Sequence, residues 1–347
     1  MEFAATRLAP SPTGALHLGH ARTFLIAWWM ARQAGAKILM RMEDLDAGRA
    51  KARSVQQAYD DLRWLGMDWD AYGSGGDVAA AEVEDGIVVQ SRRMGRYATV
   101  LGELAARGAV YLCTCTRADV AAAVERSGNA PHEGEGEVRY PGTCRKDEKQ
   151  KTQDEGVLAW ARQVIAETGK PVCFRLRVPE GRVEFEDLLA GRQGFDVAGT
   201  AGDFPVTRFW NGSGPIPPAY QLACVVDDHA MGIDRVIRGN DLLASTPRQV
   251  LIYKALGWTP PTFAHVPLVV GADGKRLAKR HGESRIAQFR AAGVPVEKVV
   301  GWAAWRSGQV ERPREISAGE VVGCFDPQKL PQERVVLGPD DLAWLNP

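Results

Sequence analysis

The chain has 347 residues, 45% of them hydrophobic and 25% charged, and its 43 Lys and Arg residues balance 43 Asp and Glu residues. This length and composition are typical of a globular protein of about two domains and exclude a disordered chain, a collagen-like chain and a small disulfide-stapled peptide. The balanced charge argues against non-specific coating of nucleic acid but permits a local basic face.

Neither a membrane span nor an export signal is evident. The longest uncharged stretch, residues 209–226, contains three prolines and two glycines, which excludes a membrane helix. The amino terminus, MEFAATR, has no apolar signal-peptide core. We therefore expect a cytoplasmic protein without a membrane partner, whose six cysteines serve as thiols or metal ligands in a reducing compartment.

The amino-terminal third predicts an α/β fold. Residues 3–8 indicate a buried strand, residues 18–33 a helix that stops at Gly35, and residues 36–42 a second strand, as a βαβ unit requires. Two amphipathic helices are expected at 50–65 and 91–107. A parallel sheet covered by helices follows from this alternation.

The pattern changes after residue 110. Two close cysteines, a short helix near 118–124, a glycine- and charge-rich stretch and strands near 172–178 indicate an insertion. The α/β pattern then returns with a strand at 204–209, a helix after Pro218, a strand at 234–238, and a helix at 246–256 closed by Gly257.

Four parts are expected from this pattern. Residues 1–110 and 196–290 form the two halves of a nucleotide-binding domain, residues 111–195 are inserted between them, and residues 291–347 form a short helical region.

The first motif with chemical content is RLAPSPTGALHLGH, residues 7–20. The spacing of His17 and His20 places both rings on one face of a helix start. The free N–H groups of that start attract an anion, and Gly19 lets a nucleotide approach the backbone closely. Polyphosphate binding is the physical interpretation, and histidines that merely cap or pack the helix are the alternative.

Two further motifs carry charge. In MRMEDLD, Glu43 follows the carboxyl end of the second strand, where a carboxylate can hold an ammonium group. Asp46 of the same motif fits a solvated loop. The loop DGKRLAKRHG, residues 273–282, carries four basic residues, Lys275, Arg276, Lys279 and Arg280, and can close over a triphosphate, although such a loop taken alone is usually a solvated charge run.

Together and in this order, the motifs resemble those of class I aminoacyl-tRNA synthetases. HLGH and RLAKR resemble the HIGH and KMSKS signatures, RLAPSPTGALHLGHAR with RMEDLD looks like the glutamyl branch, and PAYQLACVVDDHAMGIDRVIRGNDLL is similar to that branch as well. The resemblance implies an α/β fold: a Rossmann-like parallel sheet split by a zinc-containing insertion, with a short helical carboxyl-terminal region and no anticodon-binding domain.

The resemblance also implies site residues. The implied glutamate-binding set is Arg7, Leu8, Ala9, Pro10, Ser11, Glu43, Tyr220 and Arg238, whose arginines suit a substrate with two carboxylates. The implied ATP-binding set is His17, Gly19, His20 and Lys279, with Mg²⁺ accompanying ATP and with His17, His20 and Lys279 catalytic. The chain departs from the family loop at Arg276 and Ala278, where lysine and serine are usual, so it retains the charge but loses a hydroxyl.

The inserted segment contains a candidate zinc site. Cys113, Cys115, Tyr140 and Cys144 could complete a tetrahedron, with His132 or a water as another fourth ligand. The alternative is a reduced thiol pair beside a lone cysteine. CTC followed by YPGTC resembles the zinc element of the glutamyl-Q tRNA(Asp) synthetase subfamily, which implies one structural Zn²⁺ per chain held by these four residues. The other three cysteines are expected to be buried apolar thiols.

Length separates the branches of the family. About sixty-five residues follow the RLAKR loop, too few for a helical anticodon-binding region. The resemblance therefore implies a monomeric enzyme that activates L-glutamate with ATP without tRNA and transfers it to the queuosine base in the anticodon of tRNA(Asp). The alternatives are a compact glutamyl-tRNA synthetase that charges the 3′ end of tRNA(Glu), an unrelated nucleotidyltransferase, and a non-catalytic RNA-binding paralogue.

Overall fold

A computed structural model describes residues 2–12, 14–46, 52–73, 77–126, 138–145, 156–275, 277 and 284–346. The predicted positions His132, Arg276, Ala278 and Lys279 lie outside the described residues. Within the described ranges, no helix is long and apolar enough to cross a membrane.

The amino-terminal half forms a four-stranded sheet in the order β1-β2-β4-β3. Its strands are β1 (Ala5–Leu8), β2 (Lys37–Met42), β3 (Val83–Glu84) and β4 (Ile87–Val89). β1, β2 and β4 are parallel, and α1 (Leu18–Gln33) joins the first two, which confirms the predicted βαβ unit. α2 (Ala52–Trp64) and α3 (Met94–Ala106), with the short helices η1 (Ala80–Glu82) and η2 (Gln90–Arg93), complete this half.

The second sheet has the order β8-β7-β10-β9. β7 (Val183–Asp187), β10 (Thr262–Val266) and β9 (Arg235–Gly239) are parallel, while β8 (Gly191–Phe195) turns back against β7. The hairpin of β7 and β8 lies inside segment 111–195 of the sequence, yet it pairs with β10. In the chain, β9 follows α7 (Tyr220–Ala230) and precedes η3 (Asn240–Ser245) and α8 (Thr246–Leu256).

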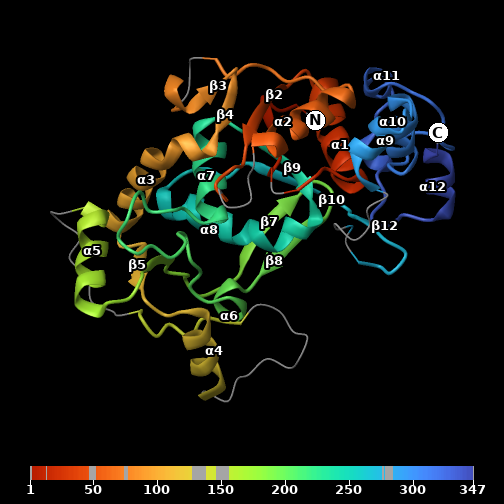
Figure 1. Cartoon of the computed structure of the whole chain (residues 1–347). Coiled ribbons are helices and arrows are strands. Elements are labelled where there is room, and N and C mark those ends of the chain that lie inside the picture. The colour runs from red at the N-terminus through yellow and green to blue at the C-terminus, as the bar shows by residue number, and fades with distance from the viewer. Residues whose placement is uncertain are drawn as a thin grey trace.

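The two sheets meet between β1 and β9. The Asp234 carboxylate, just before β9, accepts the backbone N–H groups of Ala4 at 2.8 Å and Ala5 at 2.9 Å, and the Asp234 N–H donates to the Ala5 carbonyl at 3.3 Å. Figure 1 shows β2, β9, β10 and β7 in the central part of the molecule. The strands therefore form one broken, mostly parallel layer.

Helices cover both faces of this layer. Because side chains alternate along a strand, Ile38, Met40 and Met42 of β2 enter the core that contains α1, whereas Leu39 enters the core that contains α3, α7 and α8. This arrangement confirms the predicted α/β class.

The expected strand at 204–209 is wrong. This segment makes only isolated bridges, Arg175↔Pro205 and Thr207↔Pro218. Backbone hydrogen bonds flank Pro205, from the Leu176 N–H to the Phe204 carbonyl at 2.9 Å and from the Val206 N–H to the Phe174 carbonyl at 2.8 Å. The pairing becomes irregular at Phe174, because its N–H donates to Thr207 Oγ1 at 2.9 Å and not to a backbone carbonyl.

Apart from β7 and β8, the insertion lies at one end of the molecule, and the carboxyl-terminal helices lie at the other (Figure 1). The insertion contains β5 (Val110–Cys113) paired with β6 (Cys173–Leu176), and the helices α4 (Arg117–Arg126), α5 (Gly156–Thr168) and α6 (Val197–Thr200). The carboxyl-terminal region contains α9 (Ile286–Ala291), α10 (Val296–Trp305), α11 (Ala318–Val322), η5 (Pro327–Lys329), α12 (Pro339–Leu345), and β12 (Val335–Val336) paired with β11 (Val269–Val270).

The carboxyl-terminal region packs on α1. Arg22 of α1 is fully buried, and its guanidinium donates to the carbonyls of Pro267 at 2.7 Å and Arg306 at 3.2 Å. Trp29 of α1 donates to the Ala318 carbonyl at 3.1 Å. The region therefore buttresses the helix whose start carries the predicted histidine pair.

Candidate active site

A cleft of about 1270 Å³ opens at the carboxyl ends of β1, β2 and β9. After β1 the chain enters α1 on one face of the sheet, and after β9 it enters α8 on the other face. Neighbouring parallel strands whose connections leave to opposite faces open a crevice at their carboxyl ends. The sheet topology therefore places the cleft between β1 and β9.

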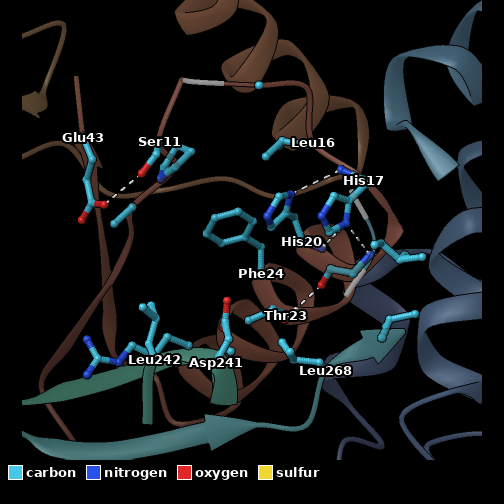
Figure 2. A pocket seen from close by; sticks show the side chains of 18 of the residues that line it. Ser11, Leu16, His17, His20, Thr23, Phe24, Glu43, Asp241, Leu242 and Leu268 are labelled. Carbon is cyan, nitrogen blue, oxygen red and sulfur yellow. Dashed lines mark hydrogen bonds between the residues drawn. The ribbon is translucent and has the colours of Figure 1, made fainter. Parts of the chain in front are cut away.

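The start of α1 forms one wall of the cleft. The rings of His17 and His20 stack with their centroids 3.7 Å apart, as the three-residue spacing predicts (Figure 2). His17 is the N-cap, and its Nδ1 accepts the N–H groups of Gly19 at 3.1 Å and His20 at 3.4 Å. A neutral ring that accepts at Nδ1 carries its proton on Nε2, where it can donate to a phosphate oxygen.

The expectation of free backbone N–H groups at this helix start needs correction. The His17 ring already accepts the N–H groups of Gly19 and His20, because an N-cap side chain satisfies the first-turn donors. The positive end of the helix thus acts on the cleft through a polarised imidazole, in addition to the backbone. The capping alternative is therefore confirmed for His17, which also lines the cleft.

Buried charges contact two of the residues that line the cleft, Arg7 and Glu43. Asp228 of α7 lies between two arginines, 3.2 Å from Arg7 Nε and 2.5 Å from Arg41 Nη1. Arg41 is fully buried, and its Nη2 donates to Glu43 Oε1 at 2.9 Å. Burial opposes ionisation of Asp228, but the charges of Arg41 and Arg7 outweigh it and hold the pKa of this carboxyl below its ordinary value. Asp228 therefore stays ionised at neutral pH.

A second buried acidic residue, Asp227, fixes the position of the helix that carries Asp228. Asp227 accepts from Arg93 Nε at 2.7 Å, from Gln90 Nε2 at 2.7 Å and from the Tyr97 hydroxyl at 3.0 Å. Arg93 also forms an ion pair with Glu82. These contacts tie α7 to η2 and α3 and so fix the helix that carries Asp228.

Sequence reasoning missed Arg41, Asp227 and Asp228. Two signals could have found them: an arginine inside the apolar strand pattern ILMRM, and adjacent aspartates inside the apolar helix pattern LACVVDD. A charge in a buried element implies a buried partner.

The Glu43 carboxylate faces the cleft near Ser11, whose hydroxyl donates to Oε2 at 3.1 Å (Figure 2). The buried thiol of Cys224 lies 3.7 Å from the other oxygen, Oε1. Tyr220, one helical turn before Cys224 on α7, also lines the cleft. An ammonium group would find a carboxyl oxygen as acceptor here.

Arg238 lies at the carboxyl end of β9 and is 5% exposed. Its Nε donates to His265 Nε2 at 3.1 Å and its Nη2 to Thr246 Oγ1 at 2.8 Å. Among the described residues, no partner reaches Nη1.

Most of the predicted substrate residues line this one cleft: Arg7, Ala9, Pro10, Ser11, His17, Gly19, His20, Glu43, Tyr220 and Arg238. Leu8 differs, because its side chain is fully buried in the core beside α1 and only its backbone lies near the cleft residues. Lys279 lies outside the described residues. The motifs did not single out Phe24, Asp241 or Leu242, which also line the cleft (Figure 2).

The predicted thiol cluster lies in the insertion. The sulfurs of Cys113, Cys115 and Cys144 lie within 4.8 Å of one another, with 3.4 Å between those of Cys115 and Cys144. The Tyr140 hydroxyl lies 3.4 Å from the Cys113 sulfur and 3.9 Å from the Cys115 sulfur. Zn–S bonds of about 2.3 Å in a tetrahedron place the sulfurs roughly 3.8 Å apart, so this donor set fits a zinc ion.

Cys173 is a fifth group near this cluster. It is buried and faces Cys113 across the β5–β6 pair. The expectation of a buried thiol is confirmed for Cys173 and Cys224, but it is wrong for Cys324, which is exposed.

Comparisons with known proteins agree with this geometry. Residues 4–343 match the family of class I tRNA synthetases for E and Q, catalytic domain. The chain is 44% identical to the Glutamyl-Q tRNA(Asp) synthetase of Symbiobacterium thermophilum over 342 residues, which cover 98% of each chain. It is also 44% identical to the Glutamyl-Q tRNA(Asp) synthetase of Rhodopirellula baltica, over 89% of this chain and 86% of that one.

Among solved structures, the chain is similar to a glutamate tRNA ligase from Elizabethkingia meningosepticum in complex with its amino acid. The TM-score is 0.77 at 26% identity, over 99% of this chain and 68% of that one.

Proposed function

This chain belongs to the class I tRNA synthetases for glutamate and glutamine, within them to the glutamyl-Q tRNA(Asp) synthetases, and we propose that it activates L-glutamate with ATP and transfers it to queuosine in tRNA(Asp). The observation that carries the proposal is one cleft that joins a carboxylate- and ammonium-binding end to the start of α1. Full-length similarity to relatives of that name supports the acceptor.

The glutamate end of the cleft is built from opposite charges. Arg7 and Arg238 offer guanidinium groups to the two carboxylates, and Glu43 with the Ser11 hydroxyl receives the ammonium group. Because all of these groups are held on strand ends or by buried partners, little ordering is needed when glutamate binds. Tyr220 closes the same end from α7.

The ATP end is the start of α1. His17 and His20 donate to the phosphates through Nε2, and Gly19 leaves room beside them, since a Cβ there would come within 3.1 Å of the His17 ring. Magnesium arrives with ATP and neutralises phosphate charge. We also propose that Lys279 of the basic loop 273–282 contacts the ATP phosphates.

Activation needs positioning more than proton transfer. The ionised α-carboxylate attacks the α-phosphorus of ATP in line, a carboxylate–phosphorus bond forms, and the bond to pyrophosphate breaks with its electron pair leaving on pyrophosphate. The histidines and the helix start stabilise charge on the phosphates. In the second step a hydroxyl of the queuosine cyclopentene-diol attacks the activated carbonyl carbon, and AMP leaves.

We also propose that Cys113, Cys115, Tyr140 and Cys144 hold one structural Zn²⁺. The support is the four-donor cluster, whose spacing suits a closed tetrahedron without an open coordination position. The ion would join β5 to the segment around Tyr140, which the Tyr140 N–H already ties to the Ala201 carbonyl. The ion would thereby stabilise the described part of the insertion around β5.

The test offers the acceptors separately. Purified protein is incubated with ATP, Mg²⁺ and labelled glutamate, together with queuosine-containing tRNA(Asp), tRNA(Asp) without queuosine, or tRNA(Glu). Label on queuosine-containing tRNA(Asp) alone supports the proposal. Label on tRNA(Glu) would instead establish a compact glutamyl-tRNA synthetase, and loss of pyrophosphate exchange would favour a non-catalytic paralogue.

A further inference from the structure

Behind Arg238 lies a buried hydrogen-bonded chain that no cleft motif contains. We propose that His265, oriented by Asp187, is a positioning residue that holds the Arg238 guanidinium ready for a carboxylate of the amino-acid substrate. This inference rests on the proposed function, in which the Arg238 guanidinium binds a carboxylate of glutamate.

Three adjacent strands supply the three residues. Asp187 ends β7, His265 is in β10, and Arg238 is in β9, and these strands neighbour one another in the order β7-β10-β9. His265 is directly opposite Arg238 in the parallel register. A paired sheet is a rigid support, so the side chains keep their relative positions.

Asp187 is held as an ionised acceptor. Its Oδ1 accepts the backbone N–H groups of Leu189 at 3.0 Å, Ala190 at 2.8 Å and His265 at 3.1 Å, and its Oδ2 lies 2.5 Å from His265 Nδ1. Burial opposes ionisation, but these hydrogen bonds outweigh it and keep the Asp187 pKa below its ordinary value. An ionised carboxylate can only accept, so His265 Nδ1 must carry a proton.

The tautomer of His265 follows from this partner. With the proton on Nδ1, the neutral ring has an acceptor at Nε2, and Arg238 Nε donates to it at 3.1 Å. Burial is the largest influence on this ring and lowers its pKa, against the opposing effect of Asp187 and with the help of the Arg238 charge. The ring is therefore neutral at neutral pH. A proton on Nε2 would place two donors, this N–H and the Arg238 Nε–H, against each other, so the proton stays on Nδ1.

Thr246 fixes the other side of the guanidinium. Arg238 Nη2 donates to Thr246 Oγ1 at 2.8 Å, and the hydroxyl can donate in turn to the Leu242 carbonyl at 3.4 Å. Two of the three guanidinium nitrogens thus have neutral acceptors. In the described part of the chain, Nη1 has no acceptor and no carboxylate pairs with Arg238, although the side chain is 95% buried and lines the cleft.

A buried donor without a partner is costly, and a buried arginine without a counter-ion more so. A substrate carboxylate in the cleft would supply both the missing acceptor and the missing charge. Because Nε and Nη2 are already committed, the guanidinium plane cannot rotate away, and Nη1, itself buried, is the nitrogen left without an acceptor.

The test compares three variants with the wild-type chain. Asp187→Asn keeps the size of the side chain, but its amide turns a donor to Nδ1 and forces the proton of His265 onto Nε2, facing Arg238. His265→Leu removes the acceptor. His265→Gln retains one acceptor and one donor in its amide and serves as the conservative variant. His229→Gln is the control, because that ring is exposed and stacks on Trp258, away from the cleft.

Glutamate-dependent pyrophosphate exchange is measured for each variant with glutamate and with ATP varied in turn, and glutamate binding is measured by calorimetry. We expect Asp187→Asn and His265→Leu to raise KM and Kd for glutamate about ten- to hundredfold while the KM for ATP changes less than about twofold. His265→Gln should lie between these variants and the wild type, and His229→Gln should equal the wild type.

Two results would overturn the inference. Unchanged glutamate KM and Kd in both Asp187→Asn and His265→Leu would show that Arg238 needs no such support. Equal losses for glutamate and ATP, with no recovery in His265→Gln, would show a general structural role. Absence of glutamate-dependent exchange in the wild type would overturn the proposed function itself, and the inference with it.

Discussion

Replacing Glu43 by glutamine isolates one charge in the glutamate end of the cleft. The amide oxygen of the new side chain could still accept from Arg41 Nη2, now 2.9 Å from Oε1, and the amide nitrogen could donate to the Ser11 hydroxyl, now 3.1 Å from Oε2. Arg41 would not lose its counter-ion, because Asp228 also pairs with it. The fold should therefore remain, and the loss should fall on the substrate ammonium group.

The size of that loss follows from the contact removed. A hydrogen bond to a charged group contributes about 1.5 to 3 kcal/mol, because its alternative is a desolvated ammonium without a counter-charge. The Glu43 side chain is only 10% exposed, so water screens this contact weakly. We expect Glu43→Gln to lower kcat/KM for glutamate about 10- to 150-fold.

Pyrophosphate exchange at varied glutamate measures this effect, with exchange at varied ATP as the internal reference. Glu82→Gln is the matched control, because Glu82 pairs with the buried Arg93 but does not line the cleft. Wild-type kcat/KM for glutamate in Glu43→Gln would refute the assignment of the ammonium group to this carboxylate. An equal loss in Glu82→Gln would attribute the effect to the buried network instead.

Three further predictions concern the rest of the molecule. Cys144→Ser should reduce zinc content from about one per chain to near zero and lower the melting temperature, whereas Cys324→Ser, an exposed thiol outside the cluster, should change neither; metal analysis and calorimetry decide. Asp227→Asn leaves the buried Arg93 short of a counter-charge and should cost about 3 kcal/mol, roughly 4 °C in melting temperature for a chain of this length; an unchanged melting temperature would contradict it. Burial raises the pKa of Asp61 to about 6. Since the folded protein then binds a proton that the unfolded chain releases, the contribution of Asp61 to stability should fall as pH rises from about 4 to about 6. In thermal unfolding, Asp61→Asn should therefore equal the wild type below about pH 4 and be more stable than the wild type at pH 7.

Local signals located the helices well. The predicted bounds of α1 and α8 agree with the structure. The His17 cap begins α1, a proline in the first turn begins α8, and Gly35 or Gly257 in the left-handed region ends each helix. The hairpin of β7 and β8 had no such signal. Its residues are half exposed and polar, and only pairing with β10 makes β7 part of the sheet.

The cleft shows the same division between local and tertiary information. Motif order identified residues on β1, β2, α1, α7 and β9 that the fold brings to one edge, because parallel strands end together. The order of the motifs could not predict the residues that orient these cleft side chains. Asp187 and His265 contact Arg238 through strand order, which no spacing along the chain records.

The three buried arginines at the cleft, Arg7 and Arg238 in its lining and Arg41 behind Glu43, differ in how far the protein neutralises their charge. Arg41 is paired with both Asp228 and Glu43, so its charge is already neutralised by the protein. Arg7 shares Asp228 with Arg41 and keeps part of its charge for a ligand. Arg238 has only the neutral hydrogen-bond acceptors His265 and Thr246 among the described residues, so the protein neutralises its charge least of the three. An uncharged amide side chain would not supply what Arg238 lacks, and the cleft should therefore favour glutamate over glutamine at this position.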